Sequence, residues 1–123
     1  MSLMDIDDMK GAVREAARVL EPGGRFLVAV VHPINSGHQL DREHPEEPLV
    51  MTDNYFDRRR YRDEIERDGL TMTFESRHWT LEDYFEALAE AGFLVELLRE
   101  RTHDEHPRWS RYPLFLHVRA VRS

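Results

Sequence analysis

Residues Asp5–Pro33 read DIDDMKGAVREAARVLEPGGRFLVAVVHP, and this segment decides the fold that the sequence predicts. Its first part predicts an amphipathic helix over residues 6–20, because apolar residues recur every three or four positions: Ile6, Met9, Val13, Ala16 and Leu20. We expect Asp5 to cap this helix, and Pro22 with the glycines after it to form a turn. The run FLVAVV at 26–31 is apolar without alternation, which is typical of a strand covered on both faces. Together these elements predict an α/β fold.

The stretch LEPGGRFLVAVVHP, residues 20–33, resembles the helix–LxPGG–strand segment that opens the second half of class I S-adenosylmethionine-dependent methyltransferases. The rest of the chain follows the order of that family: a variable insert, a helix ending in AGF, a strand and a last strand. The resemblance implies a partial Rossmann-like sheet with the spatial order 25–31, 113–121, 93–99, in which the last strand is antiparallel and central. We expect three layers, with helices 6–20 and 81–91 on the faces of the sheet.

A β-hairpin over residues 61–79 is the predicted addition to this sheet. Asp68-Gly69 is a strong hairpin signal, since both turn positions need a positive φ. Apolar Leu70, Met72 and Phe74 alternate with polar residues, which predicts one apolar face. After the hairpin, Thr80 and Asp83 are expected to cap the helix over 81–91, and Gly92 to end it.

Composition places the 123 residues in a single domain. The absence of cysteine excludes disulfides and thiolate sites and favours a reducing, cytoplasmic location. A net charge of −7 argues against nucleic-acid binding, because acids surround the one basic cluster at 58–60. No apolar run has the length of a membrane span, so no membrane partner is expected. Residues 1–3 precede a second methionine and are expected to be a cloning remnant, so the fold prediction leaves them out.

Residues 34–60 form the least regular segment and contain several turn signals, such as His44-Pro45. Long irregular segments in compact domains are usually functional or mobile. In the resembling family this position holds a substrate-covering insert, so a lid is the prediction here. Tyr55 and Phe56 could bracket a flat substrate, or serve as an ordinary apolar anchor for the loop.

His32 is the candidate catalytic residue, because it stands where the predicted central strand ends and ligands in open α/β sheets bind beyond that end. An imidazole there could orient or deprotonate a methyl acceptor. The alternative is that His32 bonds a backbone carbonyl and caps the strand. His78 and Trp79 are candidate substrate-binding residues, with ordinary packing as their alternative.

Neither a metal site nor a nucleophile is predicted. His103 and His106 have HxxH spacing but lack a committed helix and a third ligand, and His38 and His44 are isolated. There is no cysteine and no Gly-x-Ser-x-Gly elbow. A small metal-dependent enzyme built on these histidines is the least favoured interpretation.

The cofactor implied by the resemblance is S-adenosylmethionine, yet its ligands cannot be assigned. The family binds it with a glycine-rich loop between the first strand and first helix, and with an acidic residue that ends the second strand. Gly23-Gly24 instead follows a helix and precedes a strand. The sequence therefore predicts a truncated methyltransferase domain, inactive alone, that acts on a small-molecule acceptor. The alternative is a noncatalytic binding or dimerisation module, or a partner of a separate cofactor-binding chain.

Truncation would also expose an edge of the sheet. In the family, the strand over 25–31 has another neighbour that this chain does not contain. An exposed, uncharged edge strand is a template for pairing with another chain. We therefore expect a homo-oligomer that buries this edge.

Overall fold

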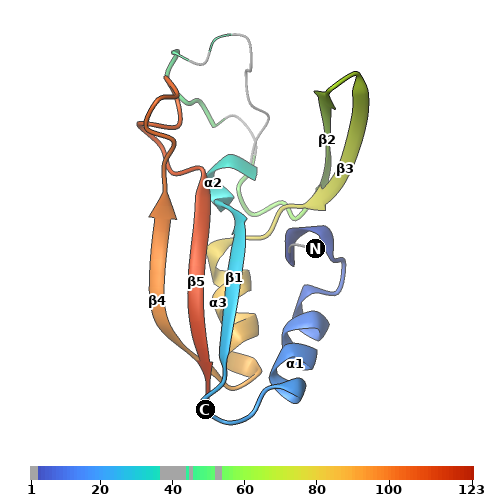
Figure 1. Ribbon diagram of the computed structural model, residues 1–123, viewed down its shortest axis with the longest axis vertical. Coiled ribbons are helices and arrows are strands. Elements are labelled where there is room, and N and C mark those ends of the chain that lie inside the picture. Colours follow the sequence, from blue (N-terminus) through green and yellow to red (C-terminus); the bar gives the residue numbers. More distant parts are fainter. Residues whose placement is uncertain (1–2, 37–43, 45, 52–53) are drawn as a thin grey trace.

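The computed structural model describes residues 3–36, 44, 46–51 and 54–123 (Figure 1). In chain order the elements are η1 (Leu3–Asp5), α1 (Met9–Val19), β1 (Arg25–Val31), α2 (Pro33–Ser36), β2 (Arg60–Arg67), β3 (Leu70–Arg77), α3 (Leu81–Glu90), β4 (Phe93–Arg101) and β5 (Phe115–Arg122). Among the described residues, no helix combines the length and the apolar character that crossing a membrane requires.

The main sheet has the order β1-β5-β4, and β5 is antiparallel to both of its neighbours. This confirms the predicted spatial order and the antiparallel last strand. Because β1 and β4 both oppose β5, they run parallel to each other, and their carboxyl ends lie at the same edge of the sheet (Figure 1). The second edge of β1 pairs with no strand among the described residues.

Helices α1 and α3 both pack on one face of this sheet. The prediction of three layers is therefore wrong, and the structure has two. One core cluster joins the helices to alternate residues of the strands: Met9, Val13, Ala17, Val28, Val30, Tyr84, Ala87, Leu88, Phe93, Leu116, Val118 and Ala120. The prediction that β1 is covered on both faces is wrong for the same reason. Val28 and Val30 point toward the helices and are buried, whereas Leu27, on the opposite face, is 72% exposed. The apolar sequence permits burial of both faces, but the described residues cover only one.

Helix α1 begins three residues later than predicted. The side chain of Asp8, not Asp5, caps it by accepting a hydrogen bond from the Gly11 N–H at 2.9 Å, and Asp5 belongs to η1. The turn after α1 forms as the sequence predicts. The Gly24 N–H donates to the Glu21 carbonyl at 2.8 Å, and Gly23 has a φ of +84°. Pro22 then occupies the second position of a type II turn, the position that proline favours.

Helix α3 has the predicted capping box. The Thr80 hydroxyl accepts from the Asp83 N–H at 3.2 Å, and the Asp83 carboxylate accepts from the Thr80 N–H at 3.0 Å. Gly92, with a φ of +87°, follows the helix and leads directly into β4. Reciprocal bonds of this kind satisfy N–H groups that the first turn leaves without helical partners.

The hairpin forms its own two-stranded sheet and stands apart from the main sheet (Figure 1). Its turn is the predicted one, with φ values of +53° at Asp68 and +78° at Gly69, as a type I′ turn requires. Leu70 and Met72 are exposed, so this part of the predicted apolar face is not buried; the side chain of Phe74 lies outside what the structure describes. An ion pair between Arg60 and Asp7 joins the base of the hairpin to the segment between η1 and α1.

The segment over 34–60 does not begin as an irregular loop. Residues 33–36 form the short helix α2 directly after β1. Its later part lies near the turn-rich segment before β5, where the Leu49 N–H donates to the Tyr112 hydroxyl at 3.3 Å. Residues 37–43, 45 and 52–53 of the predicted lid lie outside the described residues.

Candidate functional site at the carboxyl edge of the sheet

His32 stands immediately after β1 and is almost completely buried. Its Nε2 lies 2.8 Å from Oε2 of Glu100, and its Nδ1 accepts a hydrogen bond from the Ile34 N–H at 3.2 Å. Because Nδ1 is an acceptor, the proton of the neutral ring is on Nε2 and is donated to the carboxylate. His32 therefore bonds a backbone N–H and an acid rather than the backbone carbonyl considered as its alternative.

Glu100 is the part of this pair that solvent reaches, since its side chain is 54% exposed. It lies next to last in β4, whose carboxyl end shares an edge with that of β1. In this pair the buried His32 imidazole donates a hydrogen bond to Glu100. The accessible Glu100 carboxylate can still accept another hydrogen bond from a ligand.

Asn35 ties α2 to the entrance of β5. Its Nδ2 donates to the carbonyls of Pro113 and Leu114 at 2.7 and 3.2 Å. The side chain is buried, yet its Oδ1 has no hydrogen-bond partner among the described residues. A buried acceptor without a donor is uncommon in native proteins, so this oxygen can take a donor from outside the chain.

His78 is completely buried at the end of the hairpin, before α3. Its Nε2 lies 2.6 Å from the Tyr55 carbonyl oxygen, which can only accept, so Nε2 carries the proton. Its Nδ1 must then accept from the Ser36 hydroxyl, at 2.7 Å. Burial lowers the pKa of His78, and the nearby Arg59 and Arg58 charges act in the same direction against the hydrogen bond to Tyr55.

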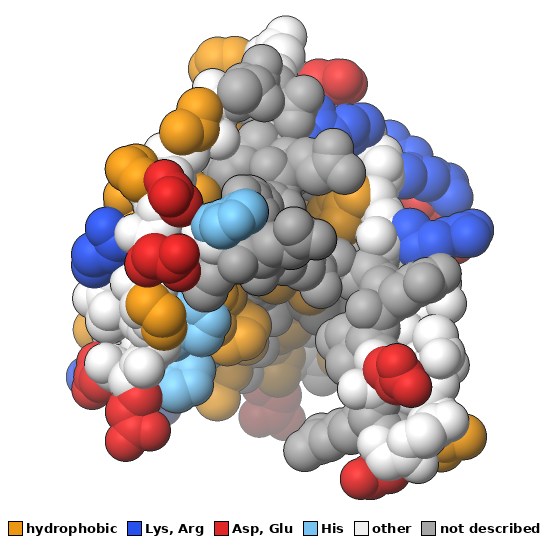
Figure 2. Space-filling model, turned by 90° about the horizontal axis from the view of Figure 1, so that it is seen from above, with side chains coloured by type: hydrophobic (Ala, Val, Ile, Leu, Met, Phe, Trp, Pro, Cys, Tyr) orange, Lys and Arg blue, Asp and Glu red, His pale blue; other side chains and the backbone are white. Residues whose placement is uncertain are grey.

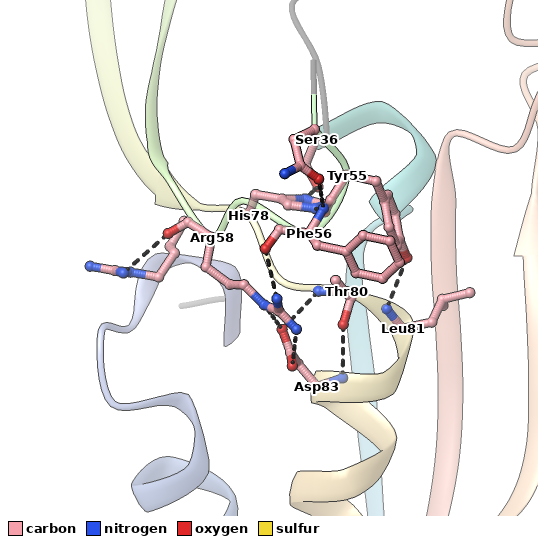
Figure 3. A network of polar contacts seen from close by, with 10 residues as sticks. Ser36, Tyr55, Phe56, Arg58, His78, Thr80, Leu81 and Asp83 are labelled. Carbon is pink, nitrogen blue, oxygen red and sulfur yellow. Dashed lines mark hydrogen bonds and ion pairs between the residues drawn. The ribbon is translucent and has the colours of Figure 1, made fainter. Parts of the chain in front are cut away.

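Tyr55 lies against this histidine, and the Phe56 ring lies against Tyr55 (Figure 3). The Tyr55 ring centroid is 5.3 Å from that of His78 and 5.2 Å from that of Phe56. The Tyr55 hydroxyl accepts the Leu81 N–H at 3.1 Å in the first turn of α3. The insert is thus anchored on the helix through Tyr55, while the Phe56 ring remains 62% exposed.

Arg58 fixes the same segment through a two-point ion pair with Asp83 (Figure 3). Its Nε and Nη2 donate to the two carboxylate oxygens at 2.9 and 3.0 Å. Burial alone would raise the pKa of Asp83, but the hydrogen bonds from Arg58 and Thr80 outweigh it and hold that pKa below its ordinary value. Capping of α3 and anchoring of the insert therefore depend on one carboxylate.

Trp79 is partly buried and packs against the core. The Arg77 guanidinium lies 5.6 Å from the centroid of the Trp79 ring, and the indole Nε1 of Trp79 is buried without an acceptor among the described residues.

Of the predicted site residues, the structure brings Tyr55, Phe56 and His78 together. His32 forms a separate pair with Glu100, and Ser36 of α2 connects the end of β1 to His78.

Sequence reasoning missed Glu100, Asn35 and Ser36 as members of this edge. Glu100 had a usable signal, because an acid near the end of a strand parallel to β1 must lie at the same edge as His32. Ser36 had no usable signal, because its partner His78 is 42 residues away in the sequence.

The remaining histidines lie mainly around the turn-rich segment before β5. Figure 2, which looks down on this edge, shows histidine side chains on the side of β4 and β5 and Lys/Arg side chains on the hairpin side. His103 and His106 have ring centroids 6.0 Å apart, and Nδ1 of His106 accepts the backbone N–H groups of Arg108 and Trp109. In the described part of the chain, no group of three or more His, Cys, Asp or Glu residues has the arrangement of a metal site; His38 lies outside that part.

Neither a family model nor a curated protein matches the sequence. Solved structures do match the fold. A proposed S-adenosylmethionine-dependent methyltransferase from Listeria monocytogenes aligns over 100% of this chain and 58% of its own, with a TM-score of 0.75 and 19% identity. An S-adenosylmethionine-dependent methyltransferase from Mesorhizobium loti aligns over 99% of this chain and 59% of its own, with a TM-score of 0.71 and 23% identity.

The glycopeptide N-methyltransferase MtfA, solved in complex with S-adenosyl-L-methionine, aligns over 98% of this chain and 50% of its own, with a TM-score of 0.55 and 18% identity. The chain thus spans between half and three fifths of the length of these three proteins. This agrees with the prediction of a partial domain. The chain has part of the Rossmann-like fold that these S-adenosylmethionine-dependent methyltransferases adopt.

Proposed function

We propose that this chain supplies the acceptor side of an S-adenosylmethionine-dependent methyltransferase that acts on a small molecule. The observation that carries the proposal is the His32–Glu100 pair, which lies at the carboxyl edge of a sheet whose fold matches such enzymes along its whole length. Ligands of open α/β sheets bind beyond this edge. The noncatalytic module has no comparable observation in its favour.

The described residues do not fit the cofactor itself. Four of the glycines are committed elsewhere: Gly23 and Gly24 form the turn before β1, Gly69 the hairpin turn and Gly92 the end of α3. Within the described residues, no glycine-rich loop follows a strand and opens a helix. We therefore assign the cofactor site in this proposal to polypeptide other than the described residues, and we assign the acceptor to the residues here.

Glu100 is the group proposed to accept a proton or hydrogen bond from the acceptor, because one carboxylate oxygen is oriented by His32 and the side chain is accessible. His32 is a donor in its present tautomer, so we assign it an orienting role rather than that of a base. A positioned acid–base group of this kind typically contributes 10²–10⁴-fold to a rate.

The four predicted substrate-binding residues take different roles in this proposal. In this proposal the exposed Phe56 ring covers a flat acceptor, and Trp79 lines the same site, with its buried Nε1 still without an acceptor among the described residues. Tyr55 and His78 hold the insert in place, since their polar atoms are bonded within the chain. The lid over 34–60, the cytoplasmic location and self-association through the free edge of β1 remain part of the proposal.

The test is methyl transfer by a fusion in which the part of the Mesorhizobium loti enzyme without a counterpart here is joined to this chain. Release of S-adenosylhomocysteine is followed with a panel of hydroxyl, amine and carboxylate acceptors. We expect turnover with at least one class, and a loss of about 10²-fold in Glu100→Gln. Glu75→Gln on the exposed hairpin is the matched control. A folded fusion in which both variants retain full turnover would refute the role of Glu100.

A further inference from the structure

Two hydrogen-bond acceptors at the carboxyl edge of the sheet have no donor among the residues that the structure describes. One is Oε1 of Glu100, since the hydrogen bond from His32 goes to Oε2. The other is Oδ1 of Asn35, whose side chain is buried. His32 connects the two groups, because its backbone N–H and the Asn35 Nδ2 donate to the same Leu114 carbonyl, at 3.0 and 3.2 Å.

The neighbouring side-chain donors are already used within the chain. Nε2 of His32 donates to Glu100, and Nε2 of His78 donates to the Tyr55 carbonyl. The Ser36 hydroxyl donates to Nδ1 of His78. Because a buried acceptor without a donor is costly, a ligand that brings two donors of its own gains affinity at this edge.

A carboxylate is the least suitable of the three acceptor classes considered for this chain. It would bring only acceptors to a place that already has two acceptors in excess. It would also bring a negative charge beside Glu100, in a chain whose net charge is −7.

A hydroxyl fits only in part. It has a single O–H, so it can satisfy Glu100 or Asn35 but not both. A phenol ordinarily titrates at about pH 10 and a carboxyl group at about pH 4, so a carboxylate takes little of the proton of a hydroxyl. Both nitrogens of His32 and of His78 are hydrogen-bonded within the chain, so neither imidazole is free to take that proton instead.

A primary amine matches both acceptors. Its protonated form has a positive charge, which the Glu100 carboxylate stabilises. After the loss of one proton to water it keeps two N–H groups and one lone pair. Two acceptors hold the two N–H groups and leave the lone pair unshared, which is the state that a nucleophile requires.

We propose that Glu100 and Asn35 bind a primary amine, so that the methyl acceptor of this chain is an amine; this inference rests on the proposed function. Glu100 is accessible and accepts one N–H, while His32 keeps its carboxylate oriented. Oδ1 of Asn35 accepts the second N–H and thereby gains the donor that it lacks.

The experiment titrates the ¹⁵N-labelled chain with benzylamine, benzyl alcohol and benzoate, which share a ring and differ in the polar group. NMR shifts of the Asn35 side-chain amide and the His32 backbone amide report binding at this edge. We expect benzylamine to bind about tenfold more tightly than benzyl alcohol, and benzoate not to bind there. N,N-Dimethylbenzylamine has the same charge when protonated but a single N–H, so it should bind about tenfold more weakly than benzylamine.

Two variants of β4 test the location. Glu100→Gln keeps the shape of the side chain but removes its charge, so it should abolish the preference for benzylamine over benzyl alcohol. Glu96→Gln changes the net charge equally in the same strand and should keep that preference. Circular dichroism and thermal unfolding establish that both variants are folded.

Four results would each overturn the proposal: equal affinities for benzylamine and benzyl alcohol, equal affinities for benzylamine and its dimethyl analogue, a preference that survives Glu100→Gln, or no shift of the Asn35 side-chain amide with any probe. Failure of the proposed function gives a different result. A fusion that methylates only hydroxyl acceptors would refute the amine and keep the function. An inactive fusion, with benzylamine still bound through Glu100, would refute the function and keep the amine site.

Discussion

Ser36 and His78 are 42 residues apart in the sequence, and a 2.7 Å hydrogen bond joins the Ser36 Oγ to the His78 Nδ1. The bond connects α2, at the end of β1, to the segment where the hairpin leads into α3. His78 must stay neutral to accept it, because its other nitrogen donates to Tyr55. The carboxyl edge of the sheet and the anchored insert are therefore held together by an uncharged imidazole.

Stability should decrease in mildly acidic solution because of His78. Its pKa is lowered in the folded protein from the ordinary value of 6.5, so the unfolded chain binds this proton more readily. The stabilising contribution is complete above about pH 6.5 and is lost as the pH falls below that value toward the folded pKa. Urea unfolding at several pH values should show this decline.

Replacement of His78 separates this effect from other titrations. His78→Gln retains a donor for the Tyr55 carbonyl but does not titrate, so the part of the decline due to His78 should disappear. His117→Gln, at a half-buried position on β5 in the main sheet, is the matched control. Parallel curves for wild type and His78→Gln would contradict the assignment.

The ion pair between Arg58 and Asp83 should contribute measurably to stability. Arg58→Ala removes two hydrogen bonds to a mostly buried carboxylate, and we expect a loss of about 1 kcal/mol, reduced from the value for buried charged bonds because the arginine is partly exposed. Arg62→Ala breaks the exposed pair with Glu75 on the hairpin and should leave the free energy of unfolding unchanged. Chemical denaturation measures both, and equal effects would contradict the special role of Arg58.

Two leucines distinguish the face of the main sheet that α1 and α3 cover from the opposite face, which we call the open face. Leu88→Ala in α3 removes a side chain that is 2% exposed and should cost about 3 kcal/mol. Leu27→Ala in β1 removes one that is mostly exposed and should change stability by less than about 0.5 kcal/mol in the isolated chain. A large loss for Leu27→Ala would mean that the open face is already buried, for example in an oligomer, and light scattering would identify it.

The turn before β1 should depend on the backbone of Gly23 rather than on space. A Cβ at Gly23 would meet no atom within 4 Å, but its φ of +84° disfavours other residues. Gly23→Ala should therefore cost about 1 kcal/mol, and Gly23→Asn less, because asparagine tolerates this region better. Thermal unfolding of both variants checks the order, which a purely steric effect would reverse.

The sequence predicted the fold well where the signals are local. The PGG turn, the Asp68-Gly69 hairpin and the Thr80 cap each depend on a few neighbouring residues, and the sheet order followed from the resemblance. The number of layers could not be predicted in the same way. An apolar strand such as FLVAVV shows that both faces can be buried, but what covers them depends on other parts of the protein.

The site was predicted less completely, because its contacts join distant segments. His32 was identified from its position at a strand end, but its partner Glu100 is 68 residues away and depends on the register of two strand pairs. The partners of His78 come from α2 and from the insert. A residue's position in one element was predictable, whereas its hydrogen-bond partners required the whole fold.

The most direct test of the central claim is calorimetric titration with S-adenosylhomocysteine, of this chain alone and of its fusion to the missing part of the Mesorhizobium loti enzyme. We expect no saturable binding to the chain alone and binding of one ligand per fusion molecule. That missing part, titrated by itself, is the control for any binding it has without this chain. A folded fusion that binds no ligand, or no better than the control, would contradict the claim that this chain completes a methyltransferase.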